Sequence, residues 1–198
     1  MKKVLAMTLS LFAGFMMMQP ATAATVALDF TTPTEALDMP DADATVGLVH
    51  QNIIGTDSVD LYYRTPFEGT SIADGKYTAI RANSSATYNL GTATNKVEFV
   101  WGSVDSFNLV KFYQGATLVD FVTGGNVIAE GAYSGFSFAQ VMITANSLFD
   151  RIEFSSTQNA FEIGNLKISV VPLPAALPLY GAGVALLGFM GWRKRKSA

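Results

Sequence analysis

Few residues of this chain could carry out catalysis. His50 is the sole histidine among 198 residues, and there is no cysteine. A zinc site built on several histidines and a thiolate nucleophile are therefore excluded, and any Ser-His-Asp triad would have to use His50. The G-x-S-x-G turn that presents the nucleophilic serine of an α/β-hydrolase is also absent. We expect His50 to be a surface or hydrogen-bonded residue.

Carboxylates are the remaining candidates for catalysis. Glycoside hydrolysis needs two of them about 5–10 Å apart across the scissile bond. Glu153 and Glu162 alternate with apolar neighbours, so we expect both on the solvent face of strands. A secreted hydrolase stays a less favoured alternative, with four carboxylates that qualify by type: Glu98, Asp105, Glu153 and Glu162.

Three aspartates close together in one segment could supply oxygen ligands to calcium. They are Asp38, Asp41 and Asp43. The spacing lacks the glycine and the bidentate glutamate of an EF-hand loop. A solvated loop is the favoured interpretation and a structural calcium site the alternative; no other cofactor is expected.

Trp101 could stack on a sugar ring if its indole face were exposed. Its alternation with Val97 and Phe99 instead predicts a place in the core. Other aromatic residues near polar turns could stack equally well: Tyr62, Tyr63, Tyr88 and Tyr133.

The middle of the chain, 24–170, is expected to form one all-β domain, a jelly-roll-like β-sandwich. Short β-rich runs recur there between Gly, Asn, Asp and Ser, and no helical period persists. A change of parity at Gly164-Asn165 predicts a β-bulge in the last run. The expected strands are Thr45–Ile54, Val59–Tyr63, Tyr77–Ala82, Lys96–Trp101, Phe107–Tyr113, Thr117–Val122, Phe136–Thr144, Phe149–Phe154 and Phe161–Val170.

Charge is distributed unevenly along the chain. The net charge is -3, but six of the 13 basic residues lie at the two ends. The middle holds the other seven and all 16 acidic residues, a net charge of -9. A surface that acidic excludes nucleic acid as a partner, because phosphate binding needs a basic footprint.

The N-terminus reads as a secretory signal peptide, 1–23, expected to form a helix. Lys2 and Lys3 precede an apolar stretch that runs to Met18. A small-x-small cleavage site follows, with Ala21 and Ala23 as its small residues and Ala24 as an alternative end. We therefore expect export by the Sec translocon and removal of the segment by signal peptidase.

The C-terminus reads as a sorting segment, 171–198, that contains a membrane span. Leu173–Trp192 is uncharged and, as a helix of about 30 Å, would just cross a hydrocarbon core. The cluster after it should stop in the cytoplasm: Arg193, Lys194, Arg195 and Lys196. An ordinary single-span anchor is the alternative.

The residues that open this segment are Val171, Pro172, Leu173, Pro174 and Ala175. Together with the span and the basic end, they resemble the VPLPA variant of the PEP-CTERM sorting segment. The resemblance implies recognition by exosortase, a membrane protease, in a Gram-negative envelope. It also implies an inner-membrane intermediate whose tail is removed or exchanged near the motif.

Two stretches of the body resemble exosortase-dependent surface proteins. Trp101–Asn108, with Val110–Tyr113 after it, is similar to a WGSxDxYN…xxFY core, and Phe161–Leu166 is similar to an FEIDN strand. Phe107 and Gly164 depart from these patterns. The resemblance implies a non-enzymatic structural or adhesive protein of the cell surface or exopolysaccharide matrix; a carbohydrate-binding module is the alternative.

Overall fold

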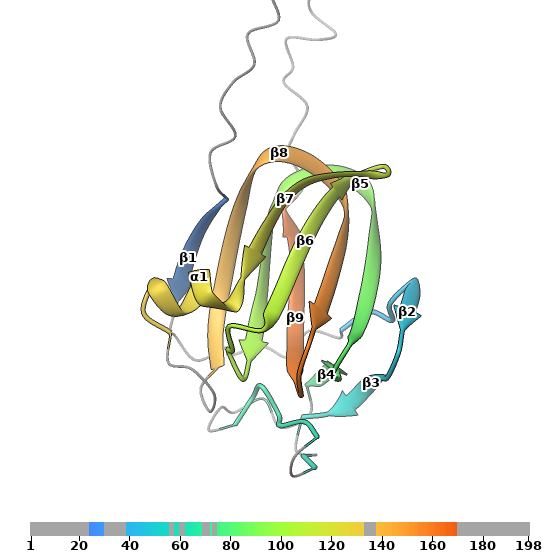
Figure 1. The fold of residues 1–198 in the computed structure, drawn as a ribbon, viewed down its shortest axis with the longest axis vertical. Helices are drawn as coiled ribbons and strands as arrows, with labels where there is room; N and C mark the ends of the chain where they lie inside the picture. The colour runs from blue at the N-terminus through green and yellow to red at the C-terminus, as the bar shows by residue number, and fades with distance from the viewer. Residues whose placement is uncertain are drawn as a thin grey trace, which may run out of the picture.

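One antiparallel sheet of nine strands makes up most of the computed structural model, which describes residues 24–29, 39–55, 58–59, 62–68, 72, 75–132 and 138–169. The all-β prediction is confirmed (Figure 1). The strands are β1 Thr25–Asp29, β2 Ala44–Val46, β3 Val49–Ile54, β4 Lys76–Ile80, β5 Ser84–Gly102, β6 Asn108–Gln114, β7 Thr117–Thr123, β8 Phe138–Ser156 and β9 Phe161–Ser169, with one short helix, α1 Gly124–Ala129.

Two long strands fold this sheet into two layers. β5 and β8 are 19 residues long each and pair with each other along their length. β5 bends near Gly91, where the register shifts, and β8 bends at the exposed residues Asn146–Leu148. Lys96–Gly102 of β5 pairs with β9, and β9 pairs with β4. The other half, Ser84–Asn89, pairs with the part of β8 that also binds β6. We call these halves the β9 layer and the β6 layer (Figure 1).

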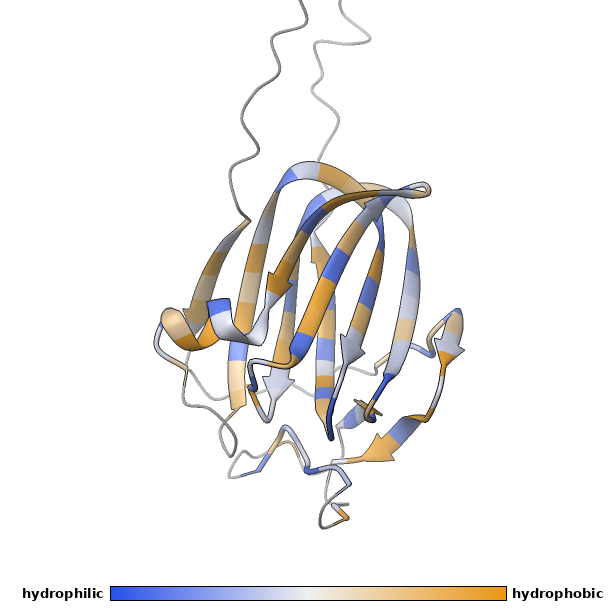
Figure 2. Ribbon diagram, viewed as in Figure 1, coloured by the Kyte–Doolittle hydropathy of each residue, from blue (hydrophilic) through white to orange (hydrophobic). Residues whose placement is uncertain are grey.

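The core lies between the two layers because apolar side chains alternate with polar ones along the strands (Figure 2). Phe154 of the β6 layer has its ring centroid 5.2 Å from Phe99 and 5.7 Å from Phe161, both in the β9 layer. Trp101 stacks on Phe161 at 4.5 Å. Buried aromatic contacts therefore hold the layers together.

Several strand predictions are confirmed. β6 and β7 form the expected hairpin, with Gln114 paired to Thr117 and Gly115 at φ 58°. The bulge is present as well: β9 uses one residue more than β5 between the paired positions, and Asn165 adopts φ 51°. The predicted strand Val59–Tyr63 is wrong, because the backbones of Val59 and Tyr63 bond to each other in an isolated bridge and the chain reverses between them.

A short segment, residues 62–68, covers the outer face of the β9 layer, and we call it the strap. Its Phe67 packs with Tyr77, Ala79 and Val100 in a second small core. Two glycines of the sheet make room for it: a Cβ on Gly164 would lie 2.5 Å from the Phe67 ring, and one on Gly102 would lie 2.8 Å from Pro66. The β9 layer is thus buried on both faces at this place.

The two ends of the described body lie at one end of the β9 layer. Thr25 pairs with Thr144, Thr144 with Lys96, and Lys96 with Ser169, in a single row across four strands. Within the described residues, no helix has the length and apolar character of a membrane span. The expected signal peptide (1–23) and sorting segment (171–198) lie outside the described residues.

Candidate functional site

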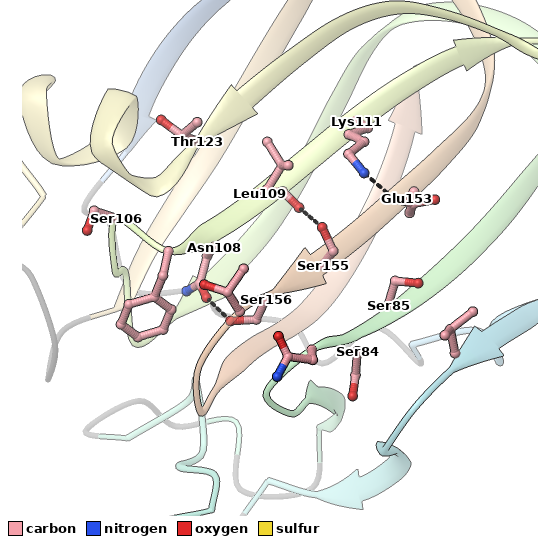
Figure 3. A pocket seen from close by; sticks show the side chains of 14 residues that line it. Ser84, Ser85, Ser106, Asn108, Leu109, Lys111, Thr123, Glu153, Ser155 and Ser156 are labelled. Carbon is pink, nitrogen blue, oxygen red and sulfur yellow. Dashed lines mark hydrogen bonds and ion pairs between the residues drawn. The ribbon is translucent and has the colours of Figure 1, made fainter.

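A polar groove of about 490 Å³ crosses the outer face of the β6 layer, open to solvent (Figure 3). The strand register explains its position. One row of paired residues runs from β2 to β7 along its floor: Val46, Ser85, Ser155, Leu109 and Thr123. Directly paired residues point to the same face of a sheet, so these five side chains lie side by side.

The groove is hollow because the centre of its floor carries small side chains while the adjacent row carries long ones. Ser85 and Ser155 are the central floor residues. In the next row, Glu153 pairs with Lys111, and both side chains line the groove as a wall. Phe107 contributes an aromatic ring to the lining.

Buried polar residues fix the end of the groove. Asn108 is fully buried, and its side-chain amide donates to the Ser103 carbonyl at 3.1 Å. The Ser156 hydroxyl is 2.8 Å from Asn108 Oδ1, and the Ser84 hydroxyl accepts the backbone N–H of Leu48 at 2.8 Å. Buried polar groups that are satisfied in this way keep a unique geometry, so the groove is preorganised.

Among the residues that the structure describes, the groove lining carries one positive and one negative side chain. Lys111 Nζ lies 2.7 Å from Glu153 Oε1, and each side chain is about a quarter to a third exposed. The hydrogen bond to Glu153 raises the pKa of Lys111, and partial burial opposes this. The pair cancels its own charge, which leaves a neutral, hydroxyl-rich lining.

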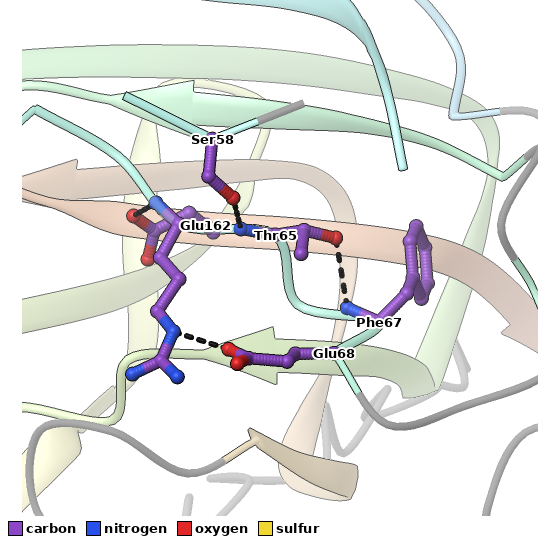
Figure 4. A network of polar contacts seen from close by, with 6 residues as sticks. Ser58, Thr65, Phe67, Glu68 and Glu162 are labelled. Atoms are coloured by element: carbon purple, nitrogen blue, oxygen red, sulfur yellow. Dashed lines mark hydrogen bonds and ion pairs between the residues drawn. The ribbon is translucent and has the colours of Figure 1, made fainter. Parts of the chain in front are cut away.

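Glu162 corrects the expectation that it lies on a solvent face. The side chain is 1% exposed, because the strap covers this part of β9. The backbone N–H of Arg64 donates to Glu162 Oε1 at 2.9 Å, and Glu162 Oε2 has no hydrogen-bond partner among the described residues. Figure 4 shows the carboxylate below the strap, where Arg64 also pairs with Glu68.

Burial raises the pKa of Glu162 to about 7. Hydrogen bonds from the Arg64 backbone and the Ser103 side chain lower it in part, and the charge of Asp105 raises it further. A shifted carboxyl group can mark a functional site, but burial under a packed segment has the same effect. In the described structure Glu162 ties the strap to the sheet.

The structure separates Glu98, Glu153 and Glu162 from one another. Glu153 lies on the outer face of the β6 layer and Glu162 on that of the β9 layer. Gly102 of β5 is the strand partner of Glu162, and Glu98 lies four positions before Gly102, about 13 Å along the strand. The Glu98 carboxylate pairs with Lys96 at 3.2 Å. Asp105 is the one candidate whose charge acts on Glu162.

His50 lies on β3, in the same row as Ala79 and Glu162. Its ring is 5.3 Å from that of Tyr63. Nε2 is buried and has no hydrogen-bond partner among the described residues. Two strand spacings separate His50 from Glu162, about 10 Å between Cα atoms, and the small Ala79 lies between them.

Trp101 is fully buried and therefore offers no face to a ligand, as its alternation predicts. Tyr88 is also buried, with its hydroxyl 3.4 Å from Thr78 and its pKa raised by burial to about 12. Tyr62 is 46% exposed, with the Arg81 guanidinium 4.0 Å from its ring centre. Tyr133 lies outside the described residues.

Asp41 and Asp43 point to different partners. Asp41 accepts from the Asn52 side chain at 2.6 Å, and Asp43 accepts from the Asn89 backbone at 2.6 Å. Asp38 lies outside the described residues. Within the part of the chain that the structure describes, no three metal-ligating side chains gather.

Sequence reasoning missed the groove. The signal that could have revealed it is the alternation of polar and apolar residues in Ser85–Tyr88, set against the same alternation in Ile152–Ser155. Comparison of the chain with protein-family models, curated proteins and solved structures gave no match.

Proposed function

We propose that this protein is an exported, non-catalytic surface protein with a structural or adhesive role in the exopolysaccharide matrix or envelope of a Gram-negative bacterium. Its path would use the Sec translocon and signal peptidase at the N-terminus and exosortase at the C-terminus. It would pass through an inner-membrane intermediate before it reaches the cell surface or the matrix.

The sorting part of this proposal is supported by the order of residues in the tail. The motif Val171–Ala175 opens an uncharged segment of membrane length, and four consecutive basic residues, 193–196, follow it. This order is the single observation that carries the proposal.

A non-catalytic body is supported by the state of its carboxylates. Glu98 and Glu153 each bind a lysine. Glu162 is held beneath the strap, where a substrate of polysaccharide size has no access. A secreted hydrolase would need two carboxylates facing one bond. The jelly-roll-like sandwich and the two flanking helices belong to the same proposal, and the two layers of the folded sheet support the sandwich.

A carbohydrate-binding module is the second candidate, and the groove of the β6 layer favours it. Concave sites with a few convergent polar groups are typical of small-ligand recognition. This candidate is compatible with surface sorting, because an adhesive role in a matrix needs a ligand in that matrix.

The deciding experiment is intact-mass analysis of the protein from cells with and without active exosortase, combined with fractionation. We expect a mass loss that corresponds to cleavage near Pro172–Ala175 only where exosortase is active. A full-length tail in both strains would contradict the sorting proposal and favour a plain membrane anchor.

A further inference from the structure

We propose that the groove across the β6 layer binds a neutral polysaccharide chain. This inference deepens the adhesive role and rests on the proposed function, because it names the ligand class and the residues that would contact it. The hydroxyl groups of the lining favour a sugar, and the absence of a net charge on the Lys111–Glu153 pair favours a neutral one.

Hydroxyl groups are the chemical match for a sugar, because each donates one hydrogen bond and accepts others, as a sugar hydroxyl does. Ser85 and Ser155 lie side by side on the groove floor, and Thr123 lies in the same row beyond Leu109, with its hydroxyl bonded to Asn126 at the start of α1. Ser85, Ser155 and Thr123 come from three different strands, so their spacing is set by the sheet. A chain that lies across the strands would meet the Ser85 hydroxyl and then the Ser155 hydroxyl.

Apolar groups in the same groove would contact the C–H faces of the sugar rings. Phe107 and Leu109 line it, and Val46 is 66% exposed at its β2 end. Aromatic and aliphatic side chains mixed with a few polar groups are the usual composition of a binding cleft.

Charge decides between neutral and acidic polysaccharides. Among the described residues, Lys111 is the one cation of the lining, and Glu153 neutralises it at 2.7 Å. The body around the groove carries a net charge of -9, which repels a polyanion. A uronate-rich chain would find no unpaired cation among the described lining residues, whereas a neutral chain needs no cation.

The groove also suits a chain rather than a single sugar. Its floor row crosses five strands, about 19 Å at the usual strand spacing, which is the length of a few sugar units. The groove lies at the end of the strands away from the bend of β5 and β8. Ser169 lies beside that bend, paired with Lys96 (Figure 1). A body held by its C-terminus would present the groove to the outside.

The test is affinity electrophoresis of the full-length protein in a detergent without a sugar headgroup. Gels would contain dextran, laminarin or mannan as neutral polysaccharides, or alginate as an acidic one. We expect retardation by at least one neutral polysaccharide, at low and at high salt, and none by alginate.

Two variants test the site itself. Ser155→Ile and Ser85→Ile fill the groove floor with a residue that favours strands, and each should weaken binding about tenfold or more. Ser147→Ile, the same change at the exposed bend of β8, should leave the affinity within about twofold. Thermal unfolding of all three variants would show that the fold is retained.

Three results would overturn the inference. They are no retardation by any neutral polysaccharide, full affinity in both groove variants, and binding to alginate that salt abolishes. None of them depends on exosortase. If the groove does not bind glycan, exosortase-dependent cleavage of the tail can still be observed. If the tail is not cleaved, glycan binding by the groove can still be observed.

Discussion

The backbone N–H of Arg64 donates a hydrogen bond to Oε1 of Glu162 at 2.9 Å, across 98 positions of the chain. This bond joins the strap to the start of β9. It explains why an acidic residue lies beneath an apolar cover, since the carboxyl group satisfies a backbone donor that would otherwise be buried alone.

The first prediction concerns pH. Glu162 has a pKa of about 7 in the folded protein, against an ordinary value of 4.5. Its contribution to stability is therefore complete below pH 4.5 and is lost as the pH rises through 7. The loss amounts to about 3 kcal/mol at most. Chemical denaturation at a series of pH values would measure it.

Glu162→Gln is the matching control, because the amide oxygen still accepts the Arg64 N–H and the side chain does not ionise. We expect the free energy of unfolding of this variant to vary less between pH 5 and 8, as rough limits, than that of the wild type. The other charged groups near this carboxyl are Arg64, Glu68 and Asp105, and His50 lies in its row. If the free energy of unfolding varies equally with pH in both proteins, the pH dependence comes from these other groups and not from Glu162.

The second prediction concerns the fit of the strap. Gly164→Ala would place a Cβ 2.5 Å from Phe67 Cζ. The ring must shift in a packed environment, so we expect a loss of about 1–3 kcal/mol. Thermal or denaturant unfolding would measure this loss.

Gly125→Ala in α1 is the matched control, because its Cβ would meet Thr123 Oγ1 at 3.4 Å, an ordinary contact. It should be neutral or stabilise by up to about 1 kcal/mol. If Phe67→Ala is introduced first, the cost of Gly164→Ala should largely disappear. If Gly164→Ala lowers the free energy of unfolding equally in the wild type and in Phe67→Ala, Phe67 does not pack on Gly164.

The third prediction concerns the contact between the layers. Phe154→Ala removes a fully buried ring that touches Tyr88, Phe99 and Phe161. We expect a loss of about 3–5 kcal/mol. Phe121→Ala is the same change at a ring that is 55% exposed on β7, and it should cost within about 0.5 kcal/mol. Similar costs for the two variants would argue against a core centred on Phe154.

The fourth prediction concerns the tail. Replacement of Pro172 and Pro174 by alanine should abolish the exosortase-dependent mass loss, because both prolines belong to the motif. Pro178→Ala changes a proline outside it and should leave processing unchanged. The intact mass of each variant provides the measurement. Equal cleavage of the two variants would show that the prolines of the motif are not needed for processing.

Sequence patterns predicted the parts of the fold that depend on local alternation. The hairpin of β6 and β7 and the bulge at Gly164-Asn165 follow from apolar periodicity and from glycine between two β-rich runs. Trp101 was predicted in the core for the same reason. Each of these features is decided by residues close together in the chain.

Features that depend on distant residues could not be predicted in this way. Glu162 alternates with Phe161 and Ile163 as a solvent-face residue would, and only the strap, about a hundred positions earlier, buries it. The first half of β5 was missed because Ser84–Asn95 contains two Asn, two Ala and one Gly, residue types that are depleted in strands. Burial between β2 and β8 places those residues in the sheet.

The position of Ser169 has a mechanical consequence. β9 lies between β4 and β5 in the interior of the sheet, and its last residue lies at the opposite end from the groove. If the tail is anchored and the groove holds a ligand, tension on the protein runs parallel to the strands. The backbone hydrogen bonds of β9 would then be loaded together in shear rather than opened one at a time. Such a body would resist being pulled away from its ligand better than one anchored through an edge strand.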